Sequence, residues 1–344
     1  LGRKRPRRAA AQPGEPCRIA TICHCGAQKS RLLSGGRDNS ETLVQNCHET
    51  MGRLPTGPRS RRIPSQPLTH KGKPSQALSV TATEQPDFDA YIATAHALAD
   101  RAGAVILPHF RSNLTVDHKG GADFDPVTAA DREAETVIRQ ALADLYPSHG
   151  IVGEEFGNDR AEATYCWIID PIDGTRAFIL GQPLWGTLIG LTAAGAPLLG
   201  IMDQPFTKER FWSGESESYF RRDGETSVIK VRGCPAMSQA MLASSTPDMF
   251  AGADGERYAR LAEAVRLRRF GGDCYNYCLL AMGQIDLVVE TDLKPFDILP
   301  LIPIVERAGG VVTTWEGGDP RDGGRILAAG DPGLHAAAAE MLSR

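Results

Sequence analysis

The sequence predicts an α/β protein in which helices are layered against β-sheets from about residue 87 onward. Beyond residue 230, segments with strand and helix patterns alternate, which is the order typical of layered α/β folds. Before it, two long segments carry apolar residues every three or four positions, as amphipathic helices do. With 42% apolar residues, 23% charged residues and a net charge of −4, the composition is that of a soluble globular protein. It argues against a membrane protein, a fibrous repeat or a dedicated nucleic-acid binder.

The first 84 residues have a different composition from the rest. They carry 15 basic and 5 acidic residues, whereas the remainder has a net charge of −14. They are rich in Arg, Pro, Gly and Ser and have few large apolar residues, so we expect a disordered tail. Such a tail is either a transit segment or an upstream region translated by mistake.

The cysteines and the basic residues at the beginning of the sequence indicate the cellular compartment to be expected. No apolar segment follows the basic start, so a secretory signal is not expected. The eight cysteines show no disulfide framework, and reduced thiols in the cytoplasm are the simplest account. A plastid or another organelle is expected only if the tail is a real transit peptide.

The first half of the folded part, residues 85–228, is expected to be an α+β subdomain. Apolar spacing predicts helices over 87–111 and 130–146, the second of which ends before Pro147. Runs of strand-forming residues predict strands over 151–154, 167–170, 184–193 and 198–202.

The second half, residues 229–344, is expected to be a smaller α/β subdomain. Its predicted strands lie over 241–245, 268–271 and 285–290, and near residues 311 and 326. Its predicted helices lie over 254–266, 274–282, 297–308 and 331–342.

Residues 177–202 contain no charged side chain, and this stretch is long enough to cross a membrane. Seven Gly and Pro residues interrupt it, and Ala194-Gly195-Ala196-Pro197 has the composition of a turn. We therefore expect a buried β-hairpin and no membrane contact.

Four acidic clusters carry the functional argument, although each has a structural explanation. Thr128 and Asp131 are suited to begin a helix, Glu154 to end a strand at the surface, and Asp297 to open another helix. The segment from Asp170 to Thr175 has the composition of a turn.

Taken together, the clusters predict a metal site. Asp170 ends the apolar strand Trp167-Ile168-Ile169, at the position where open sheets present ligand sites. Asp173 can converge on the same point around the intervening turn, and Glu154 and Asp297 also lie at the ends of elements. Carboxylates without His or Cys suit hard cations, Mg²⁺ in particular.

Gly174 and Thr175 supply the second part of the predicted site. If a helix or turn begins there, its free backbone N–H groups can hold a phosphate group. A carboxylate site with metal ions about 3.5–4 Å apart, facing such N–H groups, suits hydrolysis of a phosphate monoester. One ion lowers the pKa of a water molecule, and the other stabilises the leaving oxygen.

The order and spacing of four segments match those of a known family. These segments are Asp125-x-x-Thr128-x-x-Asp131, Gly153-Glu154-Glu155, the nine residues from Trp167 to Thr175, and Asp297. They resemble the inositol monophosphatase family of Mg²⁺-dependent, lithium-sensitive phosphatases, and the likeness runs from about residue 87 to 344. The resemblance implies a layered αβαβα sandwich of the inositol monophosphatase and fructose-bisphosphatase type. It also implies a homodimer.

The resemblance implies a role for each site residue. Two or three Mg²⁺ ions would be held by Glu154, Asp170, the carbonyl of Ile172, Asp173 and Asp297. Thr175, oriented by Asp131, would help activate a water molecule that attacks the phosphate directly. The amides of Gly174 and Thr175 would hold the phosphate, while Asp125 and Thr128 would lie at the helix entry and support the ligands.

The substrate is predicted from two further segments, 271–278 and 290–297, which resemble the histidinol-phosphatase branch of this superfamily. Phe296 precedes Asp297 where the family usually has Trp. Asp273 lies where inositol phosphatases carry a small neutral residue, so Asp273 and Glu290 would form an acidic pocket beyond the phosphate. That pocket favours the ammonium and imidazole groups of histidinol phosphate. The structural alternative is that Asp273 caps the helix over 274–282.

The predicted function is therefore Mg²⁺-dependent hydrolysis of L-histidinol phosphate, a small-molecule phosphate ester, in histidine biosynthesis. The alternatives are a phosphatase for inositol 1-phosphate or a broad range of sugar phosphates, and a non-catalytic Mg²⁺-binding regulatory scaffold. No nucleic-acid partner is expected.

Overall fold

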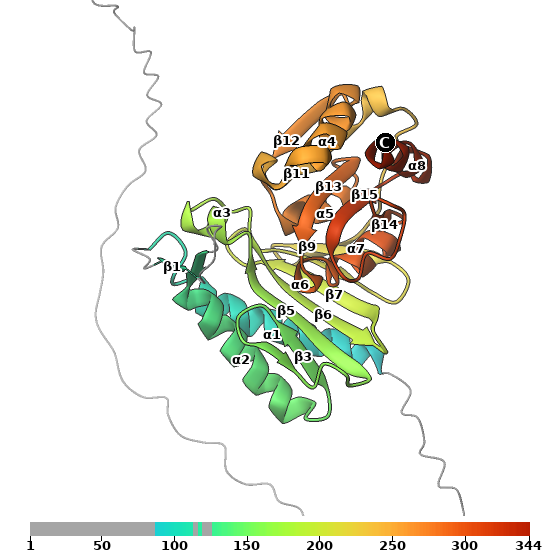
Figure 1. Ribbon diagram of the computed structural model, residues 1–344. Helices are drawn as coiled ribbons and strands as arrows, with labels where there is room; N and C mark the ends of the chain where they lie inside the picture. Colours follow the sequence, from blue (N-terminus) through green and yellow to red (C-terminus); the bar gives the residue numbers. More distant parts are fainter. Residues whose placement is uncertain (1–86, 113–115, 119–125) are drawn as a thin grey trace, which may run out of the picture. The chain divides into compact units, whose positions relative to one another are not determined.

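The computed structural model describes residues 87–112, 116–118 and 126–344 (Figure 1). The predictions for the tail over 1–84 and for Asp125 lie outside these residues. Within them, the protein has five alternating layers of helix and sheet, as the sequence and the family resemblance predicted. A short two-stranded ribbon, β1 (Val116–His118) and β2 (Pro126–Thr128), precedes the second helix.

The first layer consists of two helices, α1 (Phe88–Ile106) and α2 (Ala129–Leu145), which pack against each other and against one face of the larger sheet (Figure 1). The Asp87 carboxylate caps α1 by accepting a hydrogen bond of 3.1 Å from the N–H of Ala90. The α1 helix ends at Ile106, earlier than predicted, because residues 107–111 form turns. The buried faces of both helices and the adjoining sheet residues form one apolar core.

The second layer is an eight-stranded sheet with the order β10-β9-β8-β7-β6-β5-β3-β4. Neighbouring strands are antiparallel except β3 and β5, which are parallel. The strands are β3 (Gly150–Gly153), β4 (Gly157–Asp159), β5 (Tyr165–Asp173), β6 (Gly186–Ala193), β7 (Ala196–Gln204), β8 (Glu209–Ser213), β9 (Ser218–Arg222) and β10 (Glu225–Ile229). The short helix α3 (Thr175–Ile179) follows β5.

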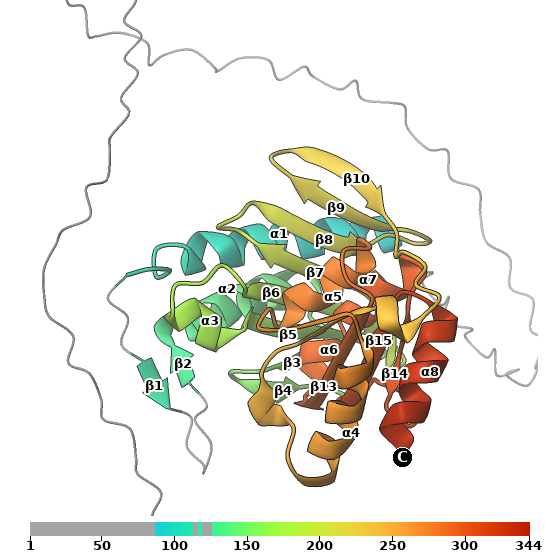
Figure 2. The ribbon, with the colours of Figure 1, turned by 90° about the horizontal axis from the view of Figure 1, so that it is seen from above.

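The third layer contains α5 (Cys274–Ala281), α6 (Pro295–Ile298) and α7 (Leu301–Arg307). The α5 and α7 helices cover the second face of the larger sheet and pack on the smaller sheet with their other side. One apolar core joins the two sheets through this layer. Figure 2 shows α5 and α7 from above, together with β8, β9 and β10 at the edge of the larger sheet.

The fourth and fifth layers complete the fold. The smaller sheet has the order β12-β11-β13-β15-β14, in which the first three strands are parallel and the last two pairings are antiparallel. Its outer face packs against α4 and α8. The elements are β11 (Met241–Ser244), α4 (Gly252–Ala264), β12 (Leu267–Phe270), β13 (Leu287–Leu293), β14 (Val311–Thr314), β15 (Gly324–Ala329) and α8 (Pro332–Ser343), with 3₁₀ turns at Met237–Gln239 and Pro247–Met249.

The uncharged stretch 177–202 forms the hairpin of β6 and β7, as predicted, with Ala194 and Gly195 at positive φ in its turn. Both strands are buried over most of their length because helices cover both faces of the larger sheet. In the part of the chain that the structure describes, no helix has the length and apolar character needed to cross a bilayer.

One predicted helix differs in the structure, and several observed strands were not predicted. The helix predicted over 297–308 is two helices, α6 and α7, with a break at Leu299 and Pro300. The residues of the break lie against the β6–β7 hairpin, where a Cβ on Gly200 would come within 1.8 Å of the Pro300 carbonyl oxygen. Strands β4, β8, β9 and β10 were not predicted, because they are short or carry many charged residues. The division into subdomains at residue 228 stays a prediction, although the two sheets are separated between Ile229 and Met241.

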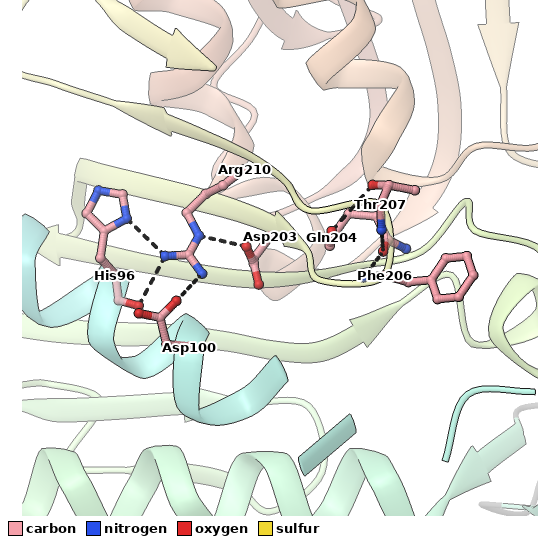
Figure 3. A network of polar contacts seen from close by, with 7 residues as sticks. All are labelled: His96, Asp100, Asp203, Gln204, Phe206, Thr207 and Arg210. Atoms are coloured by element: carbon pink, nitrogen blue, oxygen red, sulfur yellow. Dashed lines mark hydrogen bonds and ion pairs between the residues drawn. The ribbon is translucent and has the colours of Figure 1, made fainter. Parts of the chain in front are cut away.

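A buried ionic network, shown in Figure 3, ties α1 to the larger sheet. Arg210 of β8 donates from Nε to Asp203 of β7 at 2.6 Å and from Nη2 to Asp100 of α1 at 2.7 Å. Its Nη1 also lies 3.3 Å from Nδ1 of His96. Arg210 and Asp203 are both buried, so their opposite charges compensate each other where little solvent remains.

Candidate active site

A cavity of about 300 Å³ lies where β5, α3, α5, β13 and α6 meet. It collects all but one of the predicted site residues, although they come from distant parts of the chain. The predicted residues that line it are Glu154, Asp170, Ile172, Asp173, Gly174, Thr175, Asp273, Glu290 and Asp297. The remaining predicted residue, Asp131, is buried at the start of α2.

Three carboxylates in this cavity form the predicted cation site. One oxygen from each of Asp170, Asp173 and Asp297 lies within 4.8 Å of the others. The register of β5 shifts between Asp170 and Asp173, which brings two carboxylates of one strand together. Asp297 joins them from the first turn of α6, where its Oδ2 accepts from the N–H of Lys294 at 2.7 Å. The helix-opening and metal-ligand interpretations of Asp297 are therefore compatible.

When no cation is bound, burial and mutual repulsion disfavour the ionised form of these three carboxylates and raise their pKa values. Burial raises the pKa of Asp170 and of Asp173, and the negative charges around each raise it further. Burial likewise raises the pKa of Asp297 to about 7. The negative charge of Glu154 is the largest of the electrostatic contributions that raise the pKa of Asp170. A cluster of oxygen ligands with this excess of negative charge fits a hard divalent cation such as Mg²⁺.

Thr175 and Asp131 form their hydrogen bonds with other residues rather than with each other. The Thr175 hydroxyl donates to the carbonyl of Ile172 at 3.0 Å. The Asp131 carboxylate accepts from both the N–H and the hydroxyl of Thr128, at 2.8 and 2.6 Å. Thr128 in turn caps α2, so the helix-start interpretation of this segment is confirmed. The orientation of Thr175 by Asp131 stays a prediction.

Asp131 is nevertheless linked electrostatically to the cavity. Burial raises its pKa to about 6, and the negative charge of Glu154 contributes to the rise. The hydrogen bonds from Thr128 act in the opposite direction, since they stabilise the ionised carboxylate.

The acidic pocket beyond the cluster is built around Glu290. Its Oε1 accepts from the N–H of Ser245 at 2.9 Å and from the Ser245 hydroxyl, and its Oε2 accepts from the Tyr277 hydroxyl at 3.0 Å. Burial raises the pKa of Glu290 to about 7, and the nearby charge of Asp273 raises it while the hydrogen bonds lower it. The carboxylate is thus held in place by three donors.

Asp273 does not cap α5, so that alternative interpretation is wrong. Its backbone has a φ of +44°, and its side chain makes no capping hydrogen bond to the helix. Burial raises the pKa of Asp273, and the nearby Ser245 side chain acts in the opposite direction. Asp273 also packs against the predicted phosphate-binding turn, because a Cβ on Gly174 would lie 2.9 Å from its Oδ2.

Sequence reasoning missed Ser245, which contacts both Asp273 and Glu290. A signal was available, since Ser245 ends a predicted strand just as Asp170 does. The role of Tyr277 as a donor to Glu290 was also missed, because nothing in a helical segment indicates which polar group its tyrosine contacts.

The model of the inositol monophosphatase family matches residues 87–344. A bifunctional phosphatase IMPL2, chloroplastic, from Arabidopsis thaliana is 41% identical over 74% of this chain and 76% of its own length. A histidinol-phosphatase from Mycobacterium tuberculosis is 35% identical over 67% of this chain and 90% of its own length. A solved inositol monophosphatase from Zymomonas mobilis is 41% identical, with a TM-score of 0.68 over 76% of this chain and all of that one. The chain therefore belongs to the inositol monophosphatase family and is a phosphatase.

Proposed function

We propose that this phosphatase hydrolyses L-histidinol phosphate to L-histidinol and phosphate, with Mg²⁺ as its cofactor. The observation that supports this substrate is the pair formed by half-buried Asp273 and buried Glu290, which lines the same cavity as the Asp170, Asp173 and Asp297 cluster. A charge-assisted hydrogen bond from a protonated nitrogen to such a carboxylate contributes on the order of 1.5–3 kcal/mol. A neutral polyol gains only ordinary hydrogen bonds there.

The cation would be held by Glu154, Asp170, the carbonyl of Ile172, Asp173 and Asp297. Bound Mg²⁺ supplies positive charge that makes water a better nucleophile and stabilises charge on the phosphate. We propose that the backbone N–H groups of Gly174 and Thr175 orient the phosphate. In this proposal Glu154 would accept the proton of the attacking water, and the Thr175 hydroxyl, oriented by Asp131, would help to activate that water. Direct attack by water leaves no phosphorylated protein at any stage.

A second candidate is hydrolysis of inositol 1-phosphate or of several sugar phosphates. It is favoured by relatives such as the inositol-1-monophosphatase of Rhizobium meliloti, which is 30% identical over 67% of this chain. Glu290 is also able to accept hydrogen bonds from hydroxyl groups. The negative charge of half-buried Asp273 favours the cationic substrate over this alternative.

The test compares phosphate release from histidinol phosphate and inositol 1-phosphate, with Mg²⁺ and with a chelator. We expect release only with Mg²⁺, and a higher kcat/KM for histidinol phosphate. Equal or reversed kcat/KM values would refute the proposed substrate. Release of no phosphate from either ester would favour the non-catalytic Mg²⁺-binding scaffold.

The Asp273→Ala variant tests the pocket itself. We expect it to reduce kcat/KM for histidinol phosphate far more than for a generic neutral ester. If both values fall alike, Asp273 has a structural role only. The homodimer implied by the family resemblance is likewise a proposal, and light scattering would measure it.

A further inference from the structure

We propose that Asp292 is a third carboxylate of the substrate pocket and binds a second protonated nitrogen of the substrate near the solvent. This inference rests on the proposed function, because it concerns the same cavity. Asp292 lines the cavity together with Asp273 and Glu290, but unlike them it is exposed. The three carboxylates thus extend from the buried part of the cavity to its solvent side.

The position of Asp292 results from a bulge in β13. Glu290 pairs with Ile326 and Leu293 pairs with Gly324, so two residues of β13 stand opposite one residue of β15. Bulges of this kind redirect side chains and are common next to active sites. Here the extra residue follows Glu290 closely, which places Asp292 at the same cavity.

The bulge is anchored from the other side. Thr291, next to Asp292, is buried, and its hydroxyl donates to the carbonyl of Met249 at 2.6 Å. Gly323 permits close packing there, because a Cβ on it would lie 2.2 Å from the carbonyl oxygen of Leu293. The backbone of Asp292 is therefore held on both sides, and the residue has a φ of +63°. Aspartate tolerates this conformation better than most residues, but glycine adopts it with less strain.

The charge of Asp292 is uncompensated within the part of the protein that the structure describes. Among the described residues, its carboxylate forms neither a hydrogen bond nor an ion pair. Arg325, the residue opposite the bulge, is paired with Asp254 and Glu316 instead. Of the described residues that line the cavity, Arg176 is the one that is basic, and its charge acts on Asp273. A strained, uncompensated carboxylate at a cavity is expected where function rather than stability selects the residue.

The chemistry of the site selects the substrate class. The pair of half-buried Asp273 and buried Glu290 suits one nitrogen group, and exposed Asp292 suits another that remains close to water. A phosphate ester with two nitrogen groups, such as histidinol phosphate, satisfies both positions. Phosphoethanolamine, which has one ammonium group, satisfies only one of them.

The Asp292→Asn variant tests this role, since asparagine retains the shape and tolerates positive φ but carries no charge. We expect a five- to tenfold lower kcat/KM for histidinol phosphate, mainly through a higher KM. A decrease of this size is about what the loss of one partly exposed charged hydrogen bond causes. The kcat/KM values for phosphoethanolamine and for glycerol 2-phosphate should change less than twofold. Asp223→Asn is a matched control, because Asp223 also has positive φ but does not line this cavity.

The Asp292→Gly variant separates function from folding. It should show the same loss of selectivity while its Tm stays equal to or above that of the wild type, because glycine relieves the strain. If the wild type prefers histidinol phosphate and both variants keep that preference unchanged, the role of Asp292 is refuted while the proposed function stands. If the wild type itself shows no preference for histidinol phosphate, the proposed function fails first.

Discussion

The hydroxyl of Tyr277 lies 3.0 Å from Oε2 of Glu290 and donates a hydrogen bond to it, and both residues are buried beside the cavity. The contact joins α5 of the third layer to β13 of the fourth. It is one of three hydrogen bonds that compensate this carboxylate for its lost solvation. If Glu290 binds the substrate as proposed, substrate selectivity and stability are coupled at this pair.

The Tyr277→Phe variant should lower both properties. Removing one donor from a buried carboxylate costs about 1–3 kcal/mol of unfolding free energy, which denaturant titration measures. We also expect a lower preference for histidinol phosphate over inositol 1-phosphate, because the carboxylate is less firmly placed. Tyr275→Phe is the control, since the Tyr275 hydroxyl donates to Glu209, outside the cavity. A Tyr275 variant that shifts selectivity as strongly would contradict this explanation.

Asp297→Asn should abolish Mg²⁺-dependent phosphate release while stabilising the protein in the presence of a chelator. The substitution removes one charge from a buried cluster of like charges, which should raise the unfolding free energy by about 1 kcal/mol. Asparagine can still accept from the N–H of Lys294, so the start of α6 is retained. Thermal unfolding with and without Mg²⁺ measures the effect, and Mg²⁺ should raise the Tm of the wild type more than that of the variant. A variant with equal Mg²⁺ stabilisation would argue against Asp297 as a ligand.

His96 should make the protein less stable in mild acid. Burial and the positive charges of Arg210 and Arg221 lower its pKa from 6.5 to about 4. The unfolded chain therefore binds this proton more readily, so the contribution is intact above pH 6.5 and is lost as the pH falls toward 4. Allowing for partial exposure of the ring, the loss is about 1–2 kcal/mol.

The His96→Asn variant tests this prediction, because asparagine has no proton to gain in that range. Urea titrations at several pH values should show a smaller loss of stability between pH 6.5 and 4 than in the wild type. Parallel losses in both proteins would show that other groups, such as Asp203, determine the acid response.

Gly200→Ala should destabilise the protein strongly, because the new Cβ would lie 1.8 Å from the carbonyl oxygen of Pro300. Backbone must move to relieve that contact, and we expect a cost of at least about 3 kcal/mol. Gly190→Ala is the matched control on the adjacent strand, where the nearest Pro300 atom would be 3.2 Å away. Its cost should be about 1 kcal/mol or less. Similar losses of Tm for the two variants would show that the close approach of Pro300 is not important.

Much of the site could be predicted because its central motif is local. Asp170, Asp173, Gly174 and Thr175 lie within six residues, and a strand followed by a turn brings them together wherever the strand lies in the fold. Asp131 shows the limit of such reasoning. Its predicted contact with Thr175 spans 44 positions, whereas its observed contact with Thr128 spans three.

The sequence by itself determined the layered α/β class, the β6–β7 hairpin, the family and the carboxylates of the cluster, since these depend on periodicity and on spacing along the chain. Only the tertiary structure decided that Ser245 connects Asp273 and Glu290, that α6 and α7 are separate helices, and that a bulge brings Asp292 to the cavity. These features depend on how strands and helices from different layers approach one another. That approach follows from the packing of the whole core, which no single segment specifies.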